Sequence, residues 1–419
     1  MNDQSAMISE LVANARVAQN VLANSDYTAR VGALTHIAAL IRDRRDDILT
    51  TNAIDVNRAV ENKVSTAFID RLTLDNDRVE AMAAGLEAIA TLRDPLGAVL
   101  AEWTQPNGLH ISRVSTPLGI IGVIYESRPN VTIDAGGLCL MAGNAAILRG
   151  GSDSHHTATL LAEIMGQGLG AAGLPAGAVQ MVPTSDRAAV GAMLTATGEI
   201  DVIIPRGGRS LVERVQNEAR VPVFAHLEGI CHLYISAHAD AKKAVSIAVN
   251  AKMRRTGICG AAETLLIDRA IASTMLPQIA TALLDAGCEL RGDADSCALV
   301  PEMIAATDED WVTEYLDSII AVRIVDGLDA AIAHIGTYGS DHTDCIITED
   351  EAEAERFLAL VDSAIVMVNA STQFADGGEF GMGAEIGIAT GRLHARGPVG
   401  TAQLTSFKYA VRGNGQTRP

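Results

Sequence analysis

Residues 120–154, IIGVIYESRPNVTIDAGGLCLMAGNAAILRGGSDS, alternate apolar runs with polar turns. The run 120–125 has the length of a buried strand, and the polar loop after it leads into a helix that ends near Met141. A second strand, 145–148, ends in the glycine-rich turn 149–152. Strand, helix and strand in this order predict a parallel sheet covered by helices.

The same unit is repeated further along the chain. A helix at 157–169 precedes the strand 179–182, and the strand 202–204 ends in Pro205-Arg206-Gly207-Gly208. In open parallel sheets, ligands bind at the carboxyl ends of strands, and the helix N-termini there receive phosphates. Neither glycine cluster has the GxGxxG spacing, so each alone fits a plain turn better than a phosphate site. Together they predict an atypical dinucleotide-binding domain.

A second α/β unit is expected from Cys231 onward. Its strands are predicted at 233–235, 264–267, 319–325, 343–347 and 364–369, with helices at 240–250, 270–286 and 349–361 and a loop around 292–301. Residues 7–93 have helical spacing, 99–114 predict a β-hairpin that projects as an arm, and 402–411 resemble a strand. The predicted fold class is α/β, with two Rossmann-type domains.

Length and charge limit the classes of function. A chain of 419 residues is long enough for two or three domains. Its net charge of −19 and its 3% aromatic content argue against nucleic acid and anionic membranes as partners. An anionic substrate would therefore need local arginines or backbone amides.

The cysteines are typical of a reduced, cytoplasmic protein. The 6 cysteines are scattered without a CxxC pair, so their spacing predicts neither a disulfide framework nor a metal site. The N-terminus has no secretory pattern, and no run of about 18 apolar residues is present. We expect a soluble protein.

Residues 253–267, MRRTGICGAAETLLI, place Cys259 after two arginines and a glycine. Nearby positive charge lowers the pKa of a thiol and favours the reactive thiolate. Free cysteines are also often small buried apolar side chains, so this window alone leaves a nucleophile and a core residue open. The glycine-rich run 376–387 predicts a loop that brings backbone close to a ligand, and it contains Gly378, Glu379 and Phe380.

These segments together resemble the γ-glutamyl phosphate reductases (glutamate-5-semialdehyde dehydrogenases), a branch of the aldehyde dehydrogenase superfamily. The matching stretches run in the family's order from about residue 115 to the C-terminus, and YESRPN and GGEFGMGAEIGI are specific to this branch. Thr256 and Gly260 depart from the family's usual Pro and Asn around the cysteine. The thiol itself is retained.

The resemblance implies an aldehyde dehydrogenase-like fold and a reductive reaction. It implies NADPH-dependent reduction of L-glutamyl 5-phosphate to L-glutamate 5-semialdehyde and phosphate through a Cys259 thioester, in proline biosynthesis. It assigns the segments 1–98 and 118–229 to NADP(H) binding, 99–117 and 399–419 to oligomerisation, and 230–398 to catalysis.

The resemblance also assigns substrate contacts. The backbone N–H of Cys259 is the first oxyanion donor. The superfamily's second donor is an Asn in the loop that corresponds to 126–130, where Asn130 is the only amide. An alignment without gaps back from Gly143-Asn144 places Glu126 at that position instead. Arg128 and Arg255 are either clamps for the γ-phosphate or structural ion pairs. Residues 378–380 are expected to contact the substrate.

The resemblance to the superfamily also implies the cofactor contacts, most of which lie in the two glycine turns. Arg149 matches the lysine that binds the adenosine ribose, and Ser152 replaces an acidic residue that would repel a 2′-phosphate, which favours NADPH over NADH. Glu314 is either a nicotinamide-ribose ligand or a surface acid. The full set of expected cofactor residues is Arg149, Gly150, Gly151, Ser152, Arg206, Gly207, Gly208 and Glu314.

Several roles stay open at this stage. His226 and Glu228 lie in the segment that matches the superfamily's base motif, but an enzyme that keeps its thioester for hydride has reason to lack a hydrolytic base. An aldehyde dehydrogenase that oxidises another semialdehyde and a non-catalytic binding protein are the alternatives. The family resemblance also implies a homo-oligomer, dimer or tetramer, and contact with the upstream glutamate kinase.

Overall fold

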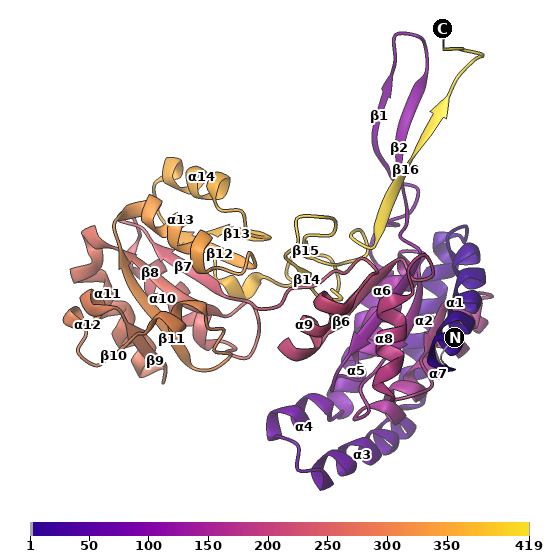
Figure 1. The fold of residues 1–419 in the computed structure, drawn as a ribbon, viewed down its shortest axis with the longest axis horizontal. Coiled ribbons are helices and arrows are strands. Elements are labelled where there is room, and N and C mark those ends of the chain that lie inside the picture. The colour runs from indigo at the N-terminus through magenta and orange to yellow at the C-terminus, as the bar shows by residue number, and fades with distance from the viewer. Residues whose placement is uncertain (1–2, 419) are drawn as a thin grey trace. The chain divides into compact units, whose positions relative to one another are not determined.

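A computed structural model describes residues 3–418 of the chain, which divide into two compact units (Figure 1). The first unit contains the residues up to Ala225 together with 381–387 and the tail from Pro398. The second contains His226–Phe380 and Ile388–Gly397.

The first unit contains a four-stranded parallel sheet with the order β5-β4-β3-β6. The strands are β3 (Ile120–Tyr125), β4 (Ala145–Arg149), β5 (Val179–Met181) and β6 (Val202–Arg206). Every residue of β3 and β4 is buried, as expected for a parallel sheet with helices on both faces. The predicted strand–helix–strand units are therefore confirmed.

The helices of this unit account for the N-terminal helical pattern and for the connections between strands. They are α1 (Asp3–Leu22), α2 (Tyr27–Asp43), α3 (Arg45–Glu61), α4 (Thr66–Leu72), α5 (Asn76–Ala90), α6 (Val131–Met141), α7 (His155–Ala171), α8 (Arg187–Thr195) and α9 (Arg209–Glu218), with the short helix η1 (Ala176–Ala178). Helix α1 packs on the sheet through Ile8, Val12 and Ala15, which are buried.

A three-stranded antiparallel arm extends from the first unit (Figure 1). The hairpin of β1 (Val99–Thr104) and β2 (His110–Pro117) is confirmed, and β16 (Thr405–Arg412) adds the third strand. The turn closes at Gly108, whose φ of 87° lies in the left-handed region. The arm exposes apolar side chains, among them Trp103 at 38% and Tyr409 at 58%.

The second unit contains a seven-stranded parallel sheet with the order β10-β9-β11-β8-β7-β12-β13. Its strands are β7 (Cys231–Ile235), β8 (Ala262–Asp268), β9 (Glu289–Gly292), β10 (Ile304–Ala305), β11 (Ile319–Val325), β12 (Thr343–Ile347) and β13 (Ile365–Val368). Its helices are α10 (Ala241–Met253), α11 (Arg269–Asp285), α12 (Ala294–Leu299), α13 (Gly327–Tyr338) and α14 (Glu351–Leu360), with the short helices η2 (Asp308–Val312) and η3 (Thr372–Phe374).

Two local features differ from the expectations. The loop predicted around 292–301 is wrong, because helix α12 forms there and the Asp293 carboxylate accepts the Ser296 N–H at 2.8 Å as an N-cap. Residues 381–387, placed with the catalytic segment from sequence, fold with the first unit, where the Ile386 and Val399 backbones are hydrogen-bonded. The short strands β14 (Ile388–Ala389) and β15 (Gly397–Pro398) follow.

Across residues 3–418, no helix has both the length and the apolar character that a membrane crossing would require.

Candidate active site

Cys259 lies in the loop that joins α10 to β8 in the second unit. The loop leaves α10 after Met253, and its Arg254 and Arg255 side chains are exposed, whereas Cys259 is half-buried. Because β8 is fully buried and belongs to the parallel sheet, the loop has one fixed end immediately after the cysteine.

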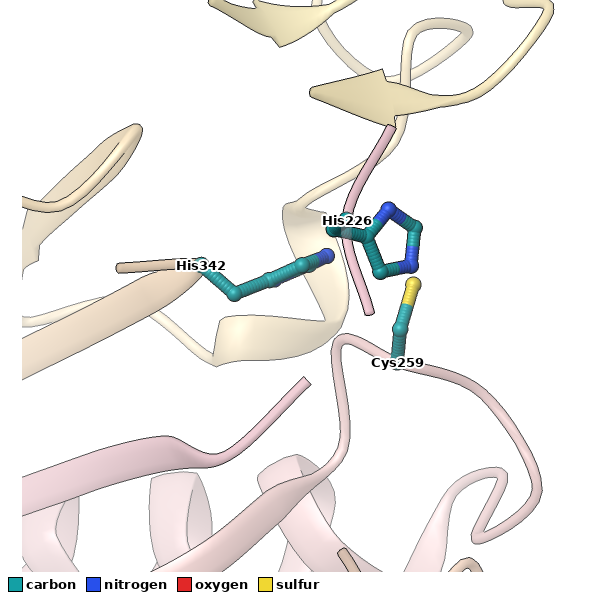
Figure 2. A group of neighbouring side chains, drawn as sticks. All are labelled: His226, Cys259 and His342. Atoms are coloured by element: carbon teal, nitrogen blue, oxygen red, sulfur yellow. The ribbon is translucent and has the colours of Figure 1, made fainter. Parts of the chain in front are cut away.

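Two histidines from distant parts of the chain lie beside this cysteine (Figure 2). One possible ligand atom from each of His226, Cys259 and His342 lies within 4.8 Å of the other two. The two imidazole rings are 4.9 Å apart between centroids and meet nearly edge to face, at 74°. His342 is fully buried, and burial first, then the proximity of His226, keeps its pKa well below the ordinary value. His342 is therefore neutral at neutral pH.

The His226 ring has a defined tautomer. Its Nδ1 lies 2.6 Å from the Ile388 carbonyl oxygen, which only accepts hydrogen bonds, so Nδ1 carries the hydrogen. In the neutral ring the other nitrogen, Nε2, has the lone pair, and Figure 2 shows this side of the ring facing the Cys259 sulfur. A neutral imidazole in this orientation is suited to accept the thiol proton.

The backbone at Gly229 approaches the nucleophile closely. A Cβ atom at this position would lie 2.2 Å from the Cys259 carbonyl oxygen and 2.7 Å from its Cα. The Gly229 N–H donates to Glu314 Oε1 at 2.9 Å, so Glu314 fixes the segment that follows His226. The expectation that Glu314 binds the nicotinamide ribose, or is a surface acid, stays a prediction beside this contact.

The close approach of Gly229 to Cys259 predicts that one added methyl group at residue 229 lowers activity strongly. We expect Gly229→Ala to lower kcat by about 10²-fold, because the nucleophile backbone must move by a substantial fraction of an ångström. Gly257→Ala is the matched control, since no atom lies within 4 Å of a Cβ built there. Steady-state kinetics with unchanged circular dichroism would test this, and equal activity of the two variants would contradict it.

Two further contacts hold the nucleophile loop. The Gln373 amide Nε2 donates to the Ala251 and Arg255 carbonyl oxygens at 2.9 and 3.2 Å, which ties η3 to the start of the loop. Lys252 and Glu263 form an ion pair at 2.5 Å with both side chains fully buried. Lys252 precedes the loop and Glu263 follows it, so the pair closes the loop at its base. Burial raises the pKa of Glu263 to about 7, an effect that the Lys252 ammonium opposes.

The expected substrate residues belong to both units. In the first, Asn130 is the N-cap of α6 and its Nδ2 donates to Asp134 Oδ2 at 2.8 Å, while Arg128 is half-buried. Burial raises the pKa of Asp134 to about 6. In the second unit, the Asp376 carboxylate accepts the Gly378 N–H at 2.8 Å, and Phe380 is 43% exposed.

Comparison with known proteins places the chain in a family. The model of the aldehyde dehydrogenase family matches residues 2–320. The γ-glutamyl phosphate reductase of Methylorubrum extorquens is 61% identical over 419 residues, with 100% of this chain and 97% of the relative covered. That of Rhodospirillum rubrum is 60% identical, with 100% of this chain and 98% of the relative covered.

The chain belongs to the γ-glutamyl phosphate reductase branch of the aldehyde dehydrogenase family. A solved γ-glutamyl phosphate reductase from Thermotoga maritima has the same fold, with a TM-score of 0.96, 42% identity, and 98% of this chain and 100% of that chain covered. The predicted aldehyde dehydrogenase-like fold is thus confirmed, and the chain is an oxidoreductase.

The turn after β4, where the sequence of this γ-glutamyl phosphate reductase family member predicts cofactor contacts, contains polar atoms suited to a ligand. Aldehyde dehydrogenases use nicotinamide cofactors. At the end of β4, Arg149 is 7% exposed and donates to the Ser185 carbonyl oxygen at 2.7 Å. Its Nε and the buried Ser154 Oγ have no hydrogen-bond partner among the described residues. A Cβ at Gly151 would lie 2.3 Å from Asp153 Oδ1, so a side chain there would displace the Asp153 carboxylate.

The second glycine turn has an acceptor within the protein. The Gly208 N–H, at the start of α9, donates to Glu126 Oε2 at 3.1 Å, and a Cβ at Gly207 would lie 2.6 Å from the same oxygen. A phosphate at this helix N-terminus would replace Glu126 as the acceptor. The turn at Arg149 is therefore the better supported of the two anion sites.

The positions of His342, Gln373 and Gly229 were not singled out from sequence. Gly229 belongs to the segment HLEGI, and its place beside the base motif was the feature of the sequence that could have pointed to it. Gly260, which replaces the family's usual Asn, packs closely against η3, because a Cβ there would lie 3.0 Å from the Thr372 carbonyl oxygen.

Proposed function

We propose that this chain reduces L-glutamyl 5-phosphate to L-glutamate 5-semialdehyde with release of phosphate, as a step of proline biosynthesis. Full-length identity of about 60% to proteins named for this activity supports the substrate. The pairing of Cys259 with the His226 imidazole is the structural observation that supports the chemistry.

The proposed reaction uses the Cys259 sulfur as the nucleophile. His226 Nε2 accepts the thiol proton, the sulfur forms a bond to the γ-carbonyl carbon while the bond to phosphate breaks, and the proton passes from His226 to the phosphate that leaves. The backbone N–H of Cys259 and the Asn130 amide are the proposed oxyanion donors. A reduced nicotinamide cofactor held at the Arg149 turn would supply the hydride that reduces the resulting thioester. The carbon–sulfur bond then breaks, and the aldehyde leaves while Cys259 returns to the thiolate.

We further propose that Arg128 and Arg255 contact the substrate phosphate and that residues 378–380 line its binding site. An arginine fork matches the geometry of phosphate oxygens. The exposed Arg255 side chain extends from the same loop as the nucleophile.

NADPH is the proposed cofactor because positive charge gathers around Arg149. Burial first, and then the charges of Arg187 and Arg214, lower the pKa of the Arg149 guanidinium, while the Asp153 and Glu126 carboxylates oppose this shift. Like charges held together are costly unless an anion lies between them, and the adenosine 2′-phosphate is such an anion. Ser152 is exposed at the same turn and carries no charge that would repel it.

Removal of one of these positive charges should weaken the binding of NADPH more than the binding of NADH. We expect Arg187→Ala to raise the KM for NADPH by roughly 10-fold or more, since a charge-assisted hydrogen bond contributes about 1.5–3 kcal/mol. The KM for NADH should change by less than about 2-fold, because NADH lacks the phosphate. Arg220→Ala, an exposed arginine of the same unit, is the control. Equal changes for both cofactors would contradict the assignment.

The arm is the proposed site of self-association. Its exposed Trp103 and Tyr409 rings contact each other edge to face at 6.2 Å, and apolar side chains continue along β1 and β16. We propose a homo-oligomer, dimer or tetramer, formed through this arm. Contact with the upstream kinase is also proposed, because an acyl phosphate is labile in water.

The decisive test of function is the phosphate dependence of the reverse reaction. With glutamate 5-semialdehyde and NADP⁺, the wild-type protein should reduce NADP⁺ only when phosphate or arsenate is present. Rapid phosphate-independent oxidation would instead indicate an ordinary aldehyde dehydrogenase in which His226 activates water.

A further inference from the structure

Three metal-ligating side chains meet at the nucleophile, although they are far apart in sequence. Figure 2 shows the Cys259 sulfur beside the His226 ring, with the His342 ring directed toward them. The ligand atoms of all three residues lie within 4.8 Å of one another. Two imidazoles and one thiolate are a ligand set that Zn²⁺ and similar borderline-soft divalent cations prefer.

His342 provides an independent indication of a ligand. Its side chain is 0% exposed, and its Nδ1 lies 2.9 Å from Thr343 Oγ1. Its Nε2 is buried without a hydrogen-bond partner among the described residues. A buried ring nitrogen without a partner is rare in folded proteins and requires an explanation. When Nδ1 donates to Thr343, Nε2 carries a lone pair.

His226 has the outer contact that is typical of metal-binding histidines. The hydrogen bond from Nδ1 to the Ile388 carbonyl oxygen, at 2.6 Å, fixes both the tautomer and the ring orientation. In this tautomer the Nε2 atom carries the lone pair of the ring and lies on the side of Cys259. The three donors thus have the chemistry of a three-ligand site with one open position.

We propose that His226, Cys259 and His342 bind Zn²⁺ or a similar borderline-soft divalent cation, and that this binding reversibly inhibits the enzyme. The metal forms bonds to Cys259 Sγ and to one ring nitrogen of each histidine, the thiol proton is released to solvent, and water occupies the fourth position. No oxidation occurs. The inhibitory consequence rests on the proposed role of Cys259, whereas the binding site itself does not.

The required adjustment is small. Zn–N and Zn–S bonds of about 2.0–2.3 Å place tetrahedral ligands within roughly 4 Å of one another. His226 and Cys259 are half-buried loop residues, so they are the members of the cluster with room to move toward the buried His342. Hard cations such as Mg²⁺ prefer oxygen ligands and should not compete.

Metal binding should be measured directly on the metal-free full-length protein. Isothermal titration with Zn²⁺ should show one site per chain, and Co²⁺ should give a sulfur-to-metal charge-transfer band. Zn²⁺ should also protect Cys259 from iodoacetamide, as located by peptide mass spectrometry, and a chelator should restore both alkylation and reductase activity.

Variants test the ligand assignment. His342→Asn keeps an amide near the Nδ1 position but removes Nε2, and it should weaken Zn²⁺ binding by at least about 10-fold. Cys259→Ser should weaken it similarly and abolish the charge-transfer band, which tests the site even if the buried His342 variant does not fold. His238→Ala, whose side chain is 59% exposed, is the histidine control and should bind as wild type.

The outcomes separate this inference from the proposed function. Absence of stoichiometric Zn²⁺ binding, or equal binding by wild type and Cys259→Ser, would overturn the metal site even if phosphate-dependent reductase activity is present. Zn²⁺ binding that requires Cys259 and His342 would support the site even if the substrate proved to be a different acyl phosphate.

Discussion

Replacement of Cys259 with serine is expected to lower kcat/KM for phosphate-dependent NADP⁺ reduction by at least about 10⁴-fold. A serine hydroxyl at this position has nearly the same size, but it is a far weaker nucleophile than a thiolate at neutral pH. Because the proposed reaction passes through a covalent bond to this sulfur, no neighbouring group replaces it. The measurement is the initial rate with glutamate 5-semialdehyde, NADP⁺ and phosphate.

The control for this variant is Cys297→Ser in the same unit. Cys297 is half-buried like Cys259, and its sulfur donates to the backbone carbonyl oxygens of Gly292 and Ile304. We expect this variant to retain activity within about 2-fold, since surface-proximal substitutions of this kind usually have small effects. If Cys259→Ser retained substantial activity, the thioester mechanism would be wrong. Equal loss in both variants would indicate a structural effect.

The buried ion pair at the base of the nucleophile loop predicts the largest change in stability. Lys252→Met removes the ammonium and leaves the Glu263 carboxyl buried at 0% exposure without its cationic partner. Loss of one partner of a buried pair costs about 3–5 kcal/mol in the free energy of unfolding. The measurement is the free energy of unfolding from chemical denaturation, taken from the transition of the second unit.

A double variant shows whether the loss comes from the unpaired carboxyl. Lys252→Met combined with Glu263→Leu removes both charges, and most of the lost stability should return, since paired replacement by apolar side chains is often nearly neutral. If the double variant were as unstable as the single one, packing around Lys252 would be the cause.

The stability of Lys252→Met should also change with pH in a defined direction. Burial already raises the pKa of Glu263 above its ordinary value of 4.5, and loss of the ammonium that lowers it would raise it further. A carboxyl whose pKa is higher in the folded state stabilises the fold below its unfolded pKa and loses this contribution as pH rises through the folded value. The deficit of Lys252→Met relative to wild type should therefore be larger at pH 8 than at pH 5.

The repeated strand–helix units were predictable because they follow from local periodicity. Buried parallel strands such as β3 require continuous apolar runs, and these are visible without tertiary information. Helix α12 was not predicted, because six residues give too little periodicity and the Asp293 cap is a short-range signal within a polar stretch.

The sequence by itself determined the α/β architecture, the family resemblance and Cys259 as the candidate nucleophile, since these depend on residue types and their order along the chain. Only the tertiary structure brought His226 and His342 to that cysteine, joined Lys252 to Glu263, and showed that Gly229 must lack a side chain. The contacts of the histidines and of Gly229 join segments that are far apart in the chain and that precede separate strands, β7, β8 and β12, whereas Lys252 and Glu263 meet across the nucleophile loop. Such contacts are set by how the parallel sheet orders its strands, and spacing along the chain does not encode them.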